Sequence, residues 1–62
     1  MYKYEIIIKQ DKVMSNDFKQ VIEILKWLLD QNYKSIFRSR SDNINMTIED
    51  EIDILMLEDN LK

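Results

Sequence analysis

The segment NDFKQVIEILKWLLDQ, residues 16–31, decides the fold. Its apolar residues recur at helical spacing, so one side of a helix would carry Phe18, Val21, Ile22, Leu25, Leu28 and Leu29. Ser15 or Asn16 can cap the first turn, and Asp17 suits the helix dipole there. Asn32 is suited to end the helix in a left-handed conformation, because the chain contains no glycine. We therefore predict a helix that ends near Gln31 and packs on a sheet.

Strands are predicted on both sides of this helix. Residues 2–9 alternate, with Tyr2, Tyr4, Ile6 and Ile8 on the side expected to face the core. Ile7 falls among charges, as a central strand with partial cover on its second face would tolerate. Residues 10–14 break the alternation. Residues 34–40 and 44–48 bracket Ser41, Asp42 and Asn43, which favour a turn, and so predict a β-hairpin.

The last segment has two interpretations. Thr47 followed by Glu49, Asp50 and Glu51 is typical of a capped helix start. Helical spacing also relates four apolar residues, which are Ile48, Ile52, Leu55 and Met56. Residues 52–54, however, alternate like a strand. We favour a helix and keep a fourth strand as the alternative, so we predict a single α+β domain over residues 1–62: a small β-α-β-β sheet, one long amphipathic helix on one face, and a C-terminal helix or fourth strand.

The size and composition limit how such a domain is stabilised. The chain has 62 residues, without cysteine or histidine, so it has neither disulfides nor the usual zinc ligands. A domain this short buries only about 60% of the surface that its unfolded chain exposes. Self-association remains open, and we expect a homodimer.

The same composition argues against catalysis. Without histidine or cysteine there is no imidazole base and no thiolate nucleophile, and without glycine there is no phosphate loop or dinucleotide fingerprint. Residues 49–53 hold four carboxylates but lack the alternating ligands and the glycine of a calcium loop. We expect no enzyme activity, no cofactor and no metal site.

Six residues are the candidates for binding a partner. Ile24 and Trp27 extend the apolar arc of the helix beyond what one small sheet covers, which suggests a surface for another protein unless a terminal helix or Tyr33 covers Trp27. The other four are Glu49, Asp50, Glu51 and Asp53, in a region of residues 42–62 that has seven acids and one lysine. The alternative for these acids is a solvated first helical turn.

Nucleic-acid binding is the less favoured class. Alternation puts Tyr33 and Phe37 on one face of their strand and Lys34, Arg38 and Arg40 on the other, so stacking and phosphate-binding groups are opposed. The net charge of −3 also argues against binding to nucleic acid, which is negatively charged.

These observations lead to one functional hypothesis with two alternatives. Isoleucine, lysine and asparagine are abundant while glycine, proline and alanine are absent, a usage typical of AT-rich genes. The longest apolar runs are far shorter than the roughly 20 residues that cross a bilayer, and no signal-peptide pattern opens the chain, so we expect a cytoplasmic protein with no membrane partner. We interpret it as a non-catalytic protein-interaction module encoded by a phage or mobile element, which inhibits a larger host defence or regulatory protein. The alternatives are a small nucleic-acid-binding regulator and an acidic nucleic-acid mimic.

Overall fold

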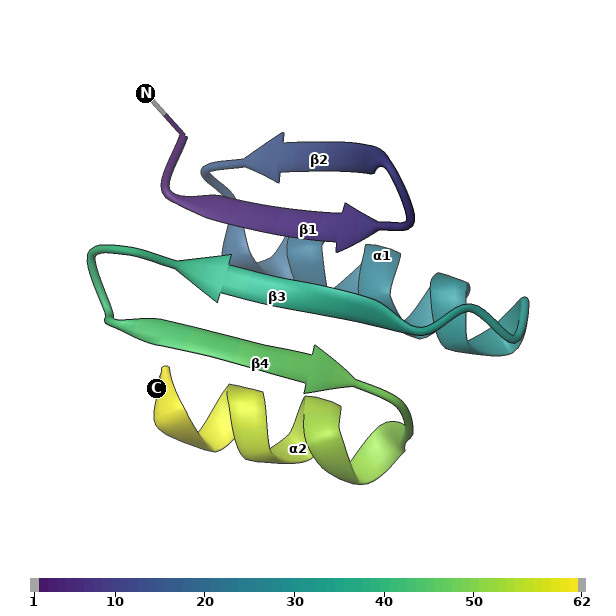
Figure 1. Cartoon of the computed structure of the whole chain (residues 1–62). Coiled ribbons are helices and arrows are strands. Elements are labelled where there is room, and N and C mark those ends of the chain that lie inside the picture. Colours follow the sequence, from purple (N-terminus) through teal and green to yellow (C-terminus); the bar gives the residue numbers. More distant parts are fainter. Residues whose placement is uncertain (1, 62) are drawn as a thin grey trace.

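The chain forms two layers, a four-stranded sheet and a pair of helices, as the computed structural model of residues 2–61 shows (Figure 1). The strands are β1 (Tyr4–Ile8), β2 (Asp11–Ser15), β3 (Ser35–Ser39) and β4 (Ile44–Ile48), all antiparallel, in the order β2-β1-β3-β4. The helices are α1 (Phe18–Asp30) and α2 (Glu51–Asn60). The α+β class and the C-terminal helix are thus confirmed, and so is the hairpin of β3 and β4.

The segment after β1 was predicted wrongly. Residues 11–15 are not a break but the edge strand β2, which pairs with β1 and places Val13 opposite Ile6. The chain reverses at Lys9, whose φ of 54° is a left-handed conformation that few residues other than glycine and asparagine adopt. Four of the five β2 residues are exposed, so this edge strand has no reason to alternate between apolar and polar residues.

One face of the sheet carries the core. The strands contribute Tyr4, Ile6, Phe37 and Ile48 to it, and the helices cover these side chains with Val21, Ile22, Leu25, Leu28, Ile54 and Leu57. The rings of Tyr4, Phe18 and Phe37 pack together, with centroids 5.5 to 6.4 Å apart. The other face of the sheet has no helix over it and is turned toward the viewer in Figure 1. Ile7 lies half-buried on that open face, as expected for the central strand β1.

The ends of α1 show which side chains act as caps. Asp17, and not Ser15 or Asn16, is the N-cap residue, and its side chain accepts a hydrogen bond of 3.0 Å from the Lys19 amide. Asn32 has a φ of 64°, and the Tyr33 amide donates to the Leu28 carbonyl at 2.8 Å. This is the left-handed helix ending predicted for Asn32.

Helix α2 begins later than Thr47 would have placed it. Thr47 and Ile48 complete β4, and Asp50 is the N-cap residue, joined to Asp53 in a capping box. This start turns Ile54 and Leu57 toward the core. Of the four apolar residues predicted at helical spacing, only Ile48 is buried, in a strand, while Ile52, Leu55 and Met56 are exposed. Helix α2 is therefore apolar on two sides.

Candidate functional site

A surface groove lies between the two helices, and we call it the helix groove. It consists of three adjoining hollows of about 360, 320 and 440 Å³. Lys26 of α1 lines all three, so the hollows form one continuous feature along α1. The pairing of α1 with α2 thus leaves a seam at the surface that their side chains do not fill.

The lining of the helix groove combines apolar side chains with an excess of carboxylates. Its apolar lining is Phe18, Ile22, Leu29, Ile54, Leu55 and Leu61. Its carboxylates are Glu23, Asp30, Glu49, Asp50, Glu51 and Glu58, against only two cations, Lys19 and Lys26. A groove of this composition suits a cationic amphipathic ligand better than an acidic one.

Next to the groove, three large apolar side chains of α2 are exposed to solvent. Ile52 is 65% exposed, Leu55 62% and Met56 52%, and their spacing puts them on one side of the helix. We call these three residues the α2 stripe. Leu55 also lines the helix groove, so the two features are continuous. Helix α2 contains four carboxylates, of Glu51, Asp53, Glu58 and Asp59, and no lysine or arginine.

The structure separates the two groups of residues predicted to bind a partner. Trp27 is 59% exposed, so neither α2 nor Tyr33 covers it fully, whereas Ile24 is half-buried against the core. Neither residue lines the helix groove. Trp27 follows Lys26 by one residue, which is a turn of about 100° away from the groove. Glu49, Asp50 and Glu51 do line the groove, at its other end from Phe18.

The predicted acids differ in what they do. Asp50 and Asp53 form the capping box: the Asp50 Oδ1 accepts from the Asp53 amide at 3.2 Å, and the Asp53 Oδ2 accepts from the amides of Glu49 and Asp50 at 2.9 and 3.3 Å. Glu49 also lies 3.9 Å from the Lys34 Nζ in an exposed ion pair, a contact that adds little stability. Glu51 is exposed at the margin of the groove, and its carboxylate makes no hydrogen bond or ion pair within residues 2–61. Two of the four acids therefore stabilise the start of α2 itself.

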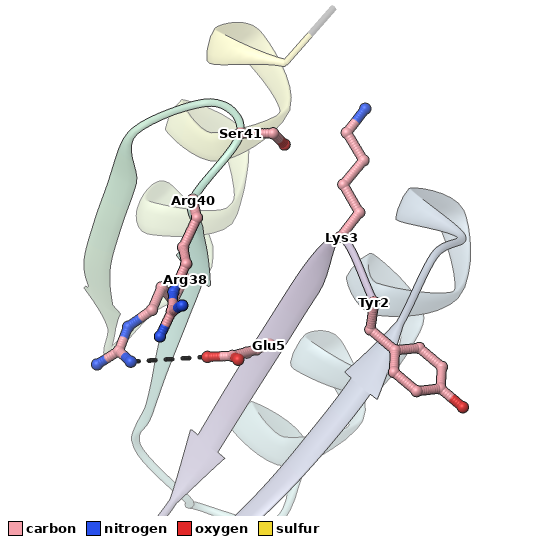
Figure 2. Close-up of a pocket in the computed structure, with 6 residues that line it drawn as sticks. All are labelled: Tyr2, Lys3, Glu5, Arg38, Arg40 and Ser41. Atoms are coloured by element: carbon pink, nitrogen blue, oxygen red, sulfur yellow. Dashed lines mark ion pairs between the residues drawn. The ribbon is translucent and has the colours of Figure 1, made fainter.

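The open face of the sheet carries a second hollow, which we call the sheet hollow. It measures about 350 Å³ and is lined by Tyr2, Lys3, Glu5, Arg38, Arg40 and Ser41 (Figure 2). Glu5 and Arg38 are opposite each other in the β1–β3 register, and the Arg38 Nη1 lies 3.6 Å from the Glu5 Oε2. As predicted, Arg38 lies on the face of β3 opposite Phe37, and Arg40, just after the strand, lines the same hollow.

Sequence reasoning missed the α2 stripe as a surface. The signal that could have found it is the competing series Ile54, Leu57 and Leu61, which also recurs at helical spacing and is the side that packs on the core. Two apolar series on one short helix imply that one of them is exposed. The end of β4 decides which one, and that end is not marked by glycine or proline.

Within residues 2–61 no group of three or more carboxylates is placed to hold a metal ion. In the same part of the chain no helix combines the length and the apolar character needed to span a bilayer. No family model matches this sequence, and neither the curated proteins nor the solved structures give a match.

Proposed function

We propose that this chain is a non-catalytic protein-interaction module, and that its partner protein binds over the α2 stripe and the helix groove. The observation that carries the proposal is the exposure of Ile52, Leu55 and Met56 together, each by more than half. Exposed apolar residues scattered singly are normal on a soluble protein, but a contiguous group bordering a groove is typical of an interaction site.

The free energy available from burying the α2 stripe is too small to explain tight binding by itself. Burying the exposed parts of these three side chains would contribute roughly 3 to 5 kcal/mol. Micromolar binding requires about 8 kcal/mol after the cost of association has been met. Contacts in the helix groove and attraction to its carboxylates must supply the difference. The partner that fits is a protein surface with apolar side chains among lysines or arginines, for example an amphipathic basic helix.

The setting that we propose is inhibition of a larger host protein by a product of a phage or mobile element. The codon usage implied by the composition supports this origin, and the small size suits a protein that acts by covering a surface. Because α2 carries four carboxylates and no cation, competition with nucleic acid for a basic surface of the host protein is the second candidate mechanism.

The test is affinity capture from lysate of a low-GC bacterial host, with three forms of the tagged protein and with nuclease treatment. One form is the natural sequence, and the second has the α2 stripe changed to I52S/L55S/M56S. The control has V13S/M14S, which removes exposed apolar groups from β2 on a different part of the surface. We expect a protein that survives nuclease and is held by the natural form and the control but not by the α2 variant. Equal capture by all three forms, or loss of every protein with nuclease, would contradict the proposal.

A further inference from the structure

We propose that the sheet hollow is a binding site for a phosphate group, held chiefly by Arg38 and Arg40. This site lies on the open face of the sheet, away from the helix groove, so it stands independently of the protein-binding surface.

The geometry of β3 brings the two guanidinium groups together. Arg38 lies in β3 and Arg40 directly follows the last residue of that strand, and both side chains line the sheet hollow. Figure 2 shows their guanidinium groups lying beside one another on the side of Glu5. Lys3 borders the hollow from the start of β1 and Ser41 from the turn after β3.

Few side chains or carbonyls of the protein bind the guanidinium groups of Arg38 and Arg40. Within the described residues 2–61, the one ion pair of Arg38 is the 3.6 Å contact with Glu5, which is longer than a hydrogen bond, and the Glu5 Oε2 has no hydrogen-bond partner. Within residues 2–61, Arg40 makes no ion pair, and neither guanidinium donates a hydrogen bond to a side chain or carbonyl. Each guanidinium offers five donors in a planar fork. A tetrahedral oxyanion between them would accept from both and relieve their repulsion.

The net charge of the chain does not oppose this binding, because the charges are separated by face. The register places Lys12 and Arg38 on the open face together with Glu5, and Lys3 and Arg40 line the hollow there, so four cations face one carboxylate. The remaining sequence carries eleven acids and five lysines. The molecule measures 17 Å along its shortest axis, and charges are screened over about 8 Å at physiological ionic strength. A ligand on the open face is therefore governed by the local positive charge.

Phosphate is favoured over a carboxylate ligand because it can take bidentate hydrogen bonds from two forks at once. Two sources supply this group, a small phosphate compound and the backbone of a nucleic-acid strand, and they share the same contacts with Arg38 and Arg40. The experiment below separates them.

The test is a titration of the isotope-labelled full chain, followed by NMR at the arginine Nε–H groups and the Ser41 amide. Sodium pyrophosphate is added in one series and a short single-stranded oligothymidylate in another. We expect saturable shifts at Arg38 and Arg40, weakened by at least about tenfold in R40Q, the equivalent of losing one charge-assisted hydrogen bond. The control K34Q, which removes an exposed cation outside the hollow, should weaken binding by no more than about twofold.

The outcomes assign the source or remove the site. Saturation by pyrophosphate identifies a site for small phosphate compounds, and saturation by the oligonucleotide alone identifies a contact with a nucleic-acid backbone. Arg40 is exposed, so R40Q should keep the amide spectrum of the core, which serves as the folding control. The absence of saturable shifts with both ligands, or equal affinity in R40Q and the natural sequence, would overturn the proposal.

Discussion

Two buried serines on the same side of β3 differ in whether their hydroxyl groups form a hydrogen bond. Ser35 and Ser39 are 3% and 1% exposed. The Ser39 hydroxyl donates to the Asp42 carboxylate at 2.8 Å, whereas the Ser35 hydroxyl has no hydrogen-bond partner in the described part of the chain. The first therefore stabilises the turn between β3 and β4, while the second is a buried polar group whose loss of hydration is not offset.

Replacing each serine with alanine should change the free energy of unfolding differently. Ser39→Ala should lower the free energy of unfolding by about 1 kcal/mol, because it removes the bond to Asp42. Ser35→Ala should leave stability unchanged or raise it, because the unsatisfied hydroxyl is removed. Urea unfolding followed by circular dichroism measures both. Equal destabilisation by the two substitutions would contradict this assignment.

At the scale of the element, α2 depends on its first turn. The capping box of Asp50 and Asp53 satisfies backbone amides that have no carbonyl partner within the helix. Glu51 lies in the same turn but makes no such bond, so it serves as a matched control for charge.

Asp50→Ala should therefore cost about 1 kcal/mol, which in a domain of this size lowers Tm by roughly 4 to 8 °C. Glu51→Ala should cost only a few tenths of a kcal/mol, because it loses just a favourable position near the helix dipole. Thermal unfolding curves of the two variants make the comparison. A larger effect from Glu51 than from Asp50 would show that charge, and not capping, stabilises α2.

The elements differ in how well the sequence predicts them, and the reason is physical. Helix α1 and the hairpin are predictable because local signals agree with the packing, down to the left-handed Asn32. Strand β2 is not predictable, since an exposed edge strand has no burial pattern and its turn uses Lys9 in place of glycine. The buried side of α2 is also not predictable, because it depends on where β4 ends, which tertiary contacts decide.

The candidate site was predictable only in part. Local sequence was enough to mark Trp27 and the acids of residues 49–51 as surface candidates. In the structure Trp27 is exposed and these acids border the helix groove. The α2 stripe and the sheet hollow depend on long-range placement. Lys3 meets Arg38, Arg40 and Ser41 only because β1 and β3 pair between segments far apart in the sequence, such as Glu5 with Arg38.

At the scale of the whole molecule, the side chain of Trp27 is exposed and packs against no other element that covers it fully. It projects from α1 on a side that does not border the helix groove, and we propose that a second copy of the chain binds there, leaving the α2 stripe free. Burying this side chain and its copy supplies apolar area that a domain of 62 residues lacks.

Trp27→Glu should therefore convert a dimer into a monomer and remove the dependence of Tm on protein concentration. Sedimentation equilibrium over a range of concentrations measures this change. Leu55→Glu is the control, because it places the same charge on α2 and should leave the dimer intact. A natural protein that is monomeric at the highest concentration would contradict dimerisation through Trp27.

The acidic helical side and the basic open face make the molecule electrically two-sided, and the central claim concerns the helical side. Its most direct test is a titration of the labelled protein with a synthetic amphipathic helical peptide that has leucines on one face and lysines on the other, followed by amide chemical shifts. We predict saturable shifts centred on Ile52, Leu55 and Met56 and on Lys26 in the helix groove, with affinity that falls as salt is added. Equal binding of a peptide with glutamates in place of the lysines, or shifts confined to residues outside α1 and α2, would contradict the account.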